Sequence, residues 1–134
     1  SNKKLLCIND SKATSFDATM QSLSNYNKIY WIVGGVPKEQ DSFYLKYVKN
    51  NIYRAYIIGD NIAFYKKQIG KSIPYIVSKN LKNAVNSIYG DFKKDNDLKK
   101  TILLSPAGAS FDQFKNFEDR GNYFKKLIGK KFNV

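Results

Sequence analysis

The feature that most constrains this chain is its alternation of short apolar runs with amphipathic stretches of helical length. Apolar runs of four to six residues are typical of strands that are buried on both faces of a sheet. Strands that alternate with helices along a chain are usually parallel and joined by crossover connections. The pattern therefore predicts a three-layer α/β fold, in which a mostly parallel sheet lies between helices on both faces.

The apolar and amphipathic periods also predict where each element lies. The expected strands are Lys4–Ile8, Lys28–Val33, Arg54–Ile58, a weak strand at Tyr75–Val77, and Thr101–Leu104. The expected helices are Asp17–Tyr26, Phe43–Lys49, Ile62–Ile69, Asn80–Phe92 and Phe111–Ile128. In the last helix Phe117 lies on the apolar stripe and is expected to face the core. The polar stretch Lys93–Lys100 is expected to be a loop.

The length of the chain, 134 residues, suits one domain with one core, and we expect residues 1–134 to form a single domain. No apolar run reaches the roughly 18 residues that a membrane helix needs, so no membrane contact is expected. The first residues lack the apolar stretch of a signal peptide. Cys7 is the only cysteine, so no internal disulfide can form, which fits a reducing compartment. We expect Cys7 to be a small buried strand residue and not a nucleophile.

A formal net charge of +12 raises the question of nucleic-acid binding. The charge is almost entirely lysine and is spread along the chain, and the only arginines are Arg54 and Arg120. Arginine is the usual bidentate reader of bases and phosphates. Nucleic acid is therefore not the expected partner. A small basic α/β module that binds nucleic acid or another polyanion remains the alternative interpretation.

The absence of histidine excludes several kinds of chemistry. Ser-His and Cys-His catalysis and histidine metal sites all need an imidazole. Lysine, aspartate, serine and threonine remain as the available reactive groups. Neither G-x-x-x-x-G-K-[ST] nor G-x-G-x-x-G occurs, which argues against a stand-alone nucleotide-binding domain.

Three polar or glycine-rich segments each follow an expected strand: Asn9–Ser15, Gly34–Lys38 and Ser105–Ser110. The carboxyl ends of parallel strands meet at one edge of a sheet, where open α/β folds bind their ligands. These segments are therefore expected to lie together and to form the functional edge.

Each candidate residue at this edge has a structural and a functional interpretation. Ser110 and Gln113 match a capping box at the start of the last helix, and the same helix start would favour an anion. Lys38 follows a glycine turn and would place a fixed cation over the edge. Thr14 or Ser15 is expected to cap the helix that begins near Asp17.

Asp10 and Lys12 also allow two interpretations. Asp10 could order the turn, or it could contact a ribose or the hydration shell of a metal. Lys12 could form a surface ion pair with Asp10, or it could bind a phosphate.

The order and spacing of five motifs resemble one known family over nearly the whole chain. The motifs are Asp10–Thr14 (DSKAT), Asp17–Ala18, Gly34–Lys38 (GGVPK), Leu103–Ala107 (LLSPA) and Ser110–Gly121 (SFDQFKNFEDRG). They are similar to the C-terminal domain of the Mur ligases, and the first motif points to the members that add D-glutamate. That domain is Rossmann-like in this family, in agreement with the pattern above.

The resemblance implies a bacterial cytoplasmic enzyme of peptidoglycan synthesis. Such a ligase would use ATP and Mg²⁺ to form an acyl phosphate on UDP-N-acetylmuramoyl-L-alanine, which the amine of D-glutamate then attacks. The N-terminal UDP-binding domain and the central ATP-binding domain of the family are absent from residues 1–134. ATP, Mg²⁺ and any metal ligands are therefore expected to belong mainly to the central domain, and the chain alone is expected to be inactive.

Carried over by position, the resemblance also implies residue roles. The carboxylates of D-glutamate would be held by side chains or backbone of Thr14, Lys38, Ser110, Phe111 and Phe117. Lys12 would face the phosphate region and Asp10 the ribose of the nucleotide.

The chain departs from the family pattern in a few places. Ser15 stands where the family often has Asn, Gly108 where Cys is common, and Phe111 where Leu is frequent. Glu39, which follows Lys38, would lower the local positive potential.

Overall fold

The structure, a computed structural model, describes residues 4–97 and 99–133. Its strands are β1 (Lys4–Asn9), β2 (Ile29–Val33), β3 (Ile52–Ile58), β4 (Tyr75–Lys79) and β5 (Lys99–Leu104). Its α-helices are α1 (Phe16–Asn25), α2 (Ile62–Ile69), α3 (Leu81–Lys94) and α4 (Phe117–Phe132). A short 3₁₀ turn, η1, covers Lys49–Asn51.

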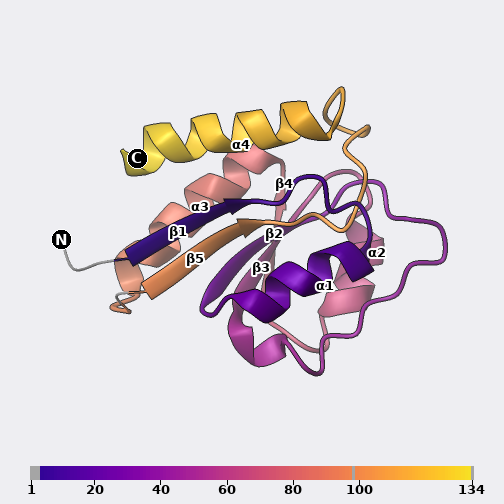
Figure 1. Ribbon diagram of the computed structural model, residues 1–134, viewed down its shortest axis with the longest axis horizontal. Helices are drawn as coiled ribbons and strands as arrows, with labels where there is room; N and C mark the ends of the chain where they lie inside the picture. Colours follow the sequence, from indigo (N-terminus) through magenta and orange to yellow (C-terminus); the bar gives the residue numbers. More distant parts are fainter. Residues whose placement is uncertain (1–3, 98, 134) are drawn as a thin grey trace.

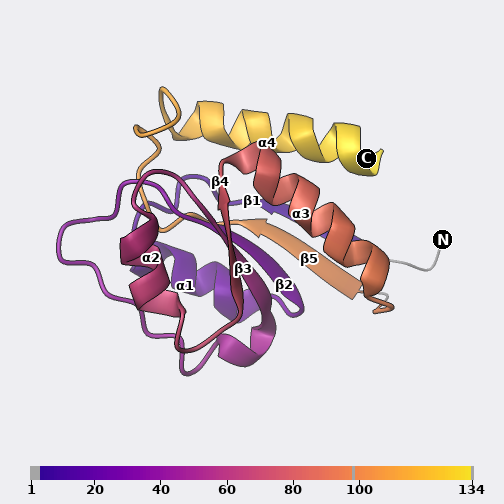
Figure 2. The same cartoon turned by 180° about the vertical axis from the view of Figure 1, so that it is seen from behind.

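The strands form one sheet in the order β1-β5-β2-β3-β4, and every pairing is parallel. Helices α1 and α2 cover one face of this sheet, and α3 and α4 cover the other (Figure 1; Figure 2 shows the reverse side). The predicted three-layer α/β architecture is confirmed. The described sheet is parallel throughout, which is more uniform than the expected mostly parallel one.

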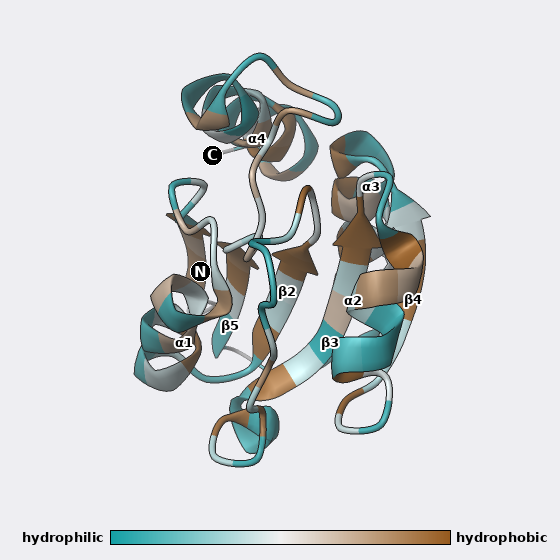
Figure 3. Cartoon of the chain, turned by 90° about the vertical axis from the view of Figure 1, so that its right-hand side faces the viewer, coloured by the Kyte–Doolittle hydropathy of each residue, from teal (hydrophilic) through white to brown (hydrophobic). Residues whose placement is uncertain are grey.

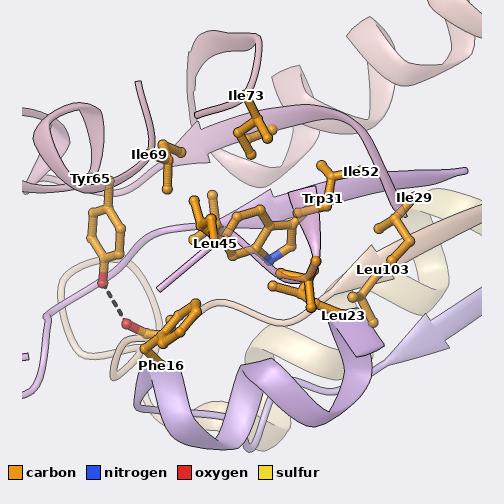
Figure 4. Close-up of a cluster of buried hydrophobic side chains, with 14 of the residues drawn as sticks. Phe16, Leu23, Ile29, Trp31, Leu45, Ile52, Tyr65, Ile69, Ile73 and Leu103 are labelled. Carbon is orange, nitrogen blue, oxygen red and sulfur yellow. Dashed lines mark hydrogen bonds between the residues drawn. The ribbon is translucent and has the colours of Figure 1, made fainter. Parts of the chain in front are cut away.

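Side chains of β2 alternate between two cores because successive residues of a strand point to opposite faces. Trp31 belongs to the core under α1 and α2, where it lies among Leu23, Leu45 and Leu103 (Figure 4). Tyr30 belongs to the core under α3 and α4. All five residues of β2 are buried, as its unbroken apolar sequence predicts.

Polar groups occur at the margin of the second core. The Tyr56 hydroxyl donates to Asp91, which also pairs with Arg54 at 2.9 Å. The Tyr30 hydroxyl donates to Asp95. Burial, followed by these hydrogen bonds to carboxylates, raises the pKa of both phenols, so both stay neutral donors.

Two helix predictions were wrong. The predicted helix Phe43–Lys49 is not formed. Leu45 and Val48 are buried side chains of an irregular segment, and Lys49 is the first residue of η1. The last helix begins at Phe117 and not at Phe111. The cause is visible in the caps: the Asn116 side chain accepts a hydrogen bond from the Asp119 amide at 2.8 Å and so starts α4 there.

The predicted loop at Lys93–Lys100 is also shorter than expected, because α3 continues to Lys94 and β5 already begins at Lys99. Within the residues that the structure describes, no helix is long and apolar enough to cross a membrane.

Candidate functional site at the carboxyl edge of the sheet

The three segments singled out from the sequence lie side by side at the carboxyl edge of the sheet. They follow β1, β5 and β2, which are neighbours in the sheet, and Figure 3 looks onto the edge that they form. The backbone joins them directly: the Asp10 amide donates to the Leu104 carbonyl at 2.7 Å, and Val36 and Ala109 exchange two hydrogen bonds of 2.8 and 2.7 Å. The prediction that these segments gather on one edge is confirmed.

Gly34 and Gly35 allow the close approach of these segments. Their φ angles are +132° and +144°, a conformation that residues with a side chain rarely adopt. A Cβ on Gly34 would overlap the Ile58 carbonyl, and one on Gly35 would overlap the Ala109 carbonyl. The glycine pair therefore keeps the Lys38 segment in contact with both the Ser110 segment and β3.

Asp10 fixes the Asn9–Ser15 segment through hydrogen bonds to neighbouring elements of the same domain. Its Oδ2 accepts hydrogen bonds from the Ser22 hydroxyl at 2.8 Å and from the Ser105 hydroxyl at 2.7 Å. Lys12 is in none of the ion pairs of the described residues, so the ion pair with Asp10, one of the two alternatives for Lys12, is not formed. Ser15 caps α1 by accepting from the Ala18 amide, one of the two residues predicted for that role.

Lys12 and Thr14 are both exposed on the same segment, and Lys12 lies between two surface hollows. The hollow on the α1 side is lined by Asp10, Lys12, Ala13, Ala18, Gln21, Ser22 and Asn25. The hollow on the α4 side is lined by Asn9, Ser11, Lys12, Phe117, Glu118 and Asn122. The ammonium group of Lys12 can therefore reach a ligand on either side.

Lys38 is exposed and belongs to a turn that is tied to the start of α1. The Asp41 amide donates to the Lys38 carbonyl at 3.0 Å, and the Asp41 carboxylate accepts from the Phe16 amide at 2.9 Å. This contact brings the Lys38 turn beside the segment that carries Thr14. Glu39 is exposed next to Lys38, as its sequence position implies.

Ser110 is not a helix cap, so that prediction was wrong. Its carbonyl accepts from the amides of Gln113 and Phe114 in an isolated turn, and α4 begins only at Phe117. Ser110 is 2% exposed, whereas Phe111 beside it is 73% exposed. A ligand at this turn would meet Phe111 first, because Ser110 is almost completely covered.

The start of the last helix was expected to favour an anion, but the start of α4 does not. Glu118 and Asp119 occupy its first turn and already satisfy the positive end of the helix dipole. Phe117 was expected in the core but is 41% exposed, because it is the first residue of the helix and faces outward. Its carbonyl accepts a hydrogen bond from the Ser11 hydroxyl at 2.7 Å, which links α4 to the first segment.

Cys7 is only partly buried, which is less than expected for a core strand residue. Burial nevertheless raises the pKa of its thiol to about 11. Cys7 is therefore protonated at neutral pH, in agreement with a residue that is not a nucleophile.

Sequence reasoning gave no site role to Arg120, yet this residue lies under the loops. Arg120 is 1% exposed and donates to Ser11 twice, from Nε to Oγ at 2.9 Å and from Nη2 to the carbonyl at 2.6 Å. One signal in the sequence could have pointed to it: it is one of two arginines in a chain whose other cations are all lysine.

Comparison with known proteins gives a consistent result. The chain is 42% identical over 121 residues to UDP-N-acetylmuramoylalanine--D-glutamate ligase of Rhizobium johnstonii, covering 90% of this chain and 26% of the relative. It is 44% identical over 122 residues to the ligase of the same name from Mesorhizobium japonicum, covering 91% and 26%. For the ligase of Brucella abortus the values are 43% over 126 residues, 93% and 27%. No protein-family model matches the chain.

The chain thus spans about a quarter of the length of these relatives, with the matched region extending over nearly all of its own residues. A region of this size agrees with one domain of a larger enzyme. The chain is therefore homologous to a domain of the UDP-N-acetylmuramoylalanine--D-glutamate ligases, the C-terminal one that its motifs resemble.

Proposed function

We propose that this chain is the acceptor-binding domain of a longer ATP-dependent ligase that joins D-glutamate to UDP-N-acetylmuramoyl-L-alanine in bacterial peptidoglycan synthesis, in the cytoplasm. The observation that carries the proposal is the gathering of three motif segments at one sheet edge in a homologue of ligases named for D-glutamate. The N-terminal and central domains of that enzyme would lie outside residues 1–134.

In this proposal the edge holds the two carboxylates of D-glutamate. Lys38 supplies a positive charge, Thr14 a hydroxyl, and the exposed turn at Phe111 a backbone amide. Ser110 and Phe117 complete the set, with Ser110 as the least accessible member. Hydrogen bonds from a cation to a carboxylate are stronger than neutral ones, so Lys38 is expected to contribute most to acceptor binding.

ATP and Mg²⁺ would be held mainly by residues outside this chain. Asp10 fits only a minor role, because its Oδ2 already accepts two hydroxyl hydrogen bonds and only Oδ1 remains for a ribose. Lys12 is exposed and fits a contact with phosphate. ATP would supply the phosphoryl group that activates the carboxylate of the UDP-linked substrate, and this chain alone would not turn over.

The test measures ADP release by the natural full-length polypeptide with UDP-N-acetylmuramoyl-L-alanine, ATP and Mg²⁺. D-glutamate, L-glutamate, lysine and diaminopimelate are offered separately, and turnover is expected with D-glutamate alone. Lys38→Ala is expected to raise the KM for D-glutamate about ten- to a hundredfold, the equivalent of about 1.5–3 kcal/mol.

Lys130→Ala is the matched control, because Lys130 is an exposed lysine in the last turn of α4. Its KM for D-glutamate is expected to stay within about twofold of the unmodified enzyme. Absence of turnover with every amino acid, in a folded protein, would contradict the proposal. Saturable nucleic-acid binding in that protein would then favour the basic-module alternative.

A further inference from the structure

Arg120 lies where the three segments of the edge meet. It extends from the first turns of α4, and its Nε and Nη2 grip the hydroxyl and carbonyl of Ser11. The third nitrogen, Nη1, lies 3.3 Å from the position that a Cβ on Gly35 would take, in the segment that leads to Lys38. Gly35 in turn packs against Ala109, which precedes Ser110.

Ser11 connects Arg120 to the other residues of the first segment and to α4 through its own hydrogen bonds. Its hydroxyl accepts from Arg120 and donates to the Phe117 carbonyl at 2.7 Å, while its amide donates to Asn9 Oδ1 at 3.2 Å. Ser11 is 3% exposed and immediately precedes the exposed Lys12. The positions of Lys12 and Thr14 therefore depend on the two hydrogen bonds that the Arg120 guanidinium donates to Ser11.

The charge of Arg120 is not neutralised by a direct partner. Nη1 is a buried atom with no hydrogen-bond partner, and no carboxylate among the described residues forms an ion pair with this guanidinium. Burial lowers the pKa of Arg120 to about 10, and the charge of Asp112 opposes that effect, so the group is cationic at neutral pH. A buried charge that is incompletely paired costs stability, and an apolar side chain of similar size would avoid that cost.

We infer that Arg120 is a positioning residue of the acceptor site, which fixes the Ser11–Thr14 segment and sets a positive charge beneath the place where a dicarboxylate would bind. The inference rests on the proposed function for the identity of that ligand. The planar guanidinium of arginine can donate several hydrogen bonds and carries a charge, so it can both fix the segment and attract an anion. A lysine would keep the charge but could not donate both hydrogen bonds to Ser11 in the same geometry. An anion above the edge would gain from this charge because the intervening layer is protein and not water.

Steady-state kinetics of the full-length enzyme tests the inference with Arg120→Lys and Arg120→Met. The control is Arg54→Met, since Arg54 is the other arginine and pairs with Asp91 away from this edge. Arg120→Met is expected to raise the KM for D-glutamate at least tenfold while the KM for the UDP-linked substrate changes less than threefold. Arg120→Lys is expected to lie between Arg120→Met and the unmodified enzyme, and Arg54→Met within twofold of the latter.

The inference is overturned if both Arg120 variants leave the KM for D-glutamate within twofold, or if Arg54→Met raises it as much. Should Arg120→Met fail to fold, Arg120→Lys and Ser11→Ala replace it. Ser11→Ala keeps the charge and removes the hydroxyl that Nε grips, so a several-fold rise in KM is expected. Unchanged values in both replacements would overturn the inference.

Amide hydrogen exchange separates this inference from the proposed function, because it needs no ligand. The Ala13 amide donates to the Asp10 carbonyl at 3.0 Å and reports on opening of the Ser11–Thr14 segment. Exchange at Ala13 is expected to be at least tenfold faster in Arg120→Met, or in Arg120→Lys, than in Arg54→Met. If the unmodified enzyme does not use D-glutamate, the proposed function fails, and equal exchange rates would show that the grip is absent as well.

Discussion

At the scale of single residues, the Tyr65 hydroxyl lies where a side chain on residue 108 would have to be, so that position can hold only glycine while the hydroxyl is present. A Cβ on Gly108 would overlap the Tyr65 hydroxyl, which donates to the Ala107 carbonyl at 2.9 Å (Figure 4). The tyrosine hydroxyl fills the space that a side chain at residue 108 would need, and its hydrogen bond supports the Ser105–Ser110 segment.

This relation predicts non-additive effects of two substitutions. Gly108→Ala is expected to destabilise the protein by about 1–3 kcal/mol through overpacking. Tyr65→Phe is expected to cost about 1–3 kcal/mol, because the buried Ala107 carbonyl loses its donor. The double variant should be less destabilised than the sum, since removal of the hydroxyl makes room for the new methyl group. Urea unfolding of the four proteins measures the coupling, and strictly additive free energies would contradict the steric relation.

Cys7 gives a prediction about pH. Burial raises the pKa of its thiol from 9.0 to about 11, so at pH 8 its thiolate fraction should be about a hundredfold below that of a free cysteine. Iodoacetamide alkylation of the native protein should be correspondingly slow and should rise only above pH 10. The contribution of this shift to stability is present below pH 9 and is lost as the pH rises through 11. Equal alkylation rates in native buffer and in urea would contradict the prediction.

At the scale of elements, strands were easier to predict than the boundaries of the last helix. The run Ile29–Val33 is apolar throughout and is buried throughout, so burial on both faces followed from composition alone. Before the last helix the sequence pattern indicated one cap, Ser110 with Gln113, whereas the structure uses a second one, Asn116, which accepts from the Asp119 amide. Local pattern cannot choose between them, because the turn between the two caps also contacts segments that are distant in the sequence, as where Asp112 accepts from the Asp60 amide at 2.9 Å.

The observed choice predicts how substitutions at the two caps differ. Asn116→Ala removes the side chain that accepts from the Asp119 amide and is expected to lower the free energy of unfolding by about 1 kcal/mol. Gln113→Ala removes only an exposed hydrogen bond to the Lys79 carbonyl and should cost less than about 0.5 kcal/mol. Denaturant titrations give both values. A larger effect for Gln113→Ala would instead support a helix that begins at Ser110.

At the scale of the whole molecule, the sequence predicted where the candidate site lies better than it predicted which of the site residues are buried and which are exposed. Parallel strands must end at one edge, so the strand-end motifs had to meet there. The burial of Ser110, the exposure of Phe117 and the grip of Arg120 on Ser11 depend on loops far apart in sequence, and no periodicity reports them. For the same reason the internal hydrogen bonds of Asp10 could be proposed only as one of two alternatives.

The net charge of +12 leads to the last prediction, which separates diffuse attraction from a nucleic-acid site. The exposed lysines come from several segments, including α2, α3, α4 and the Lys38 turn, and the more buried of the two arginines holds Ser11. Binding to single-stranded RNA should therefore be non-specific and should weaken by about a hundredfold or more between 50 and 200 mM salt. Fluorescence anisotropy with RNAs of several lengths and sequences measures this. The explanation requires affinity to follow RNA length without a fixed site size, because the exposed lysines lie on separate elements. Tight, saturable binding of one sequence at physiological salt would be incompatible with it.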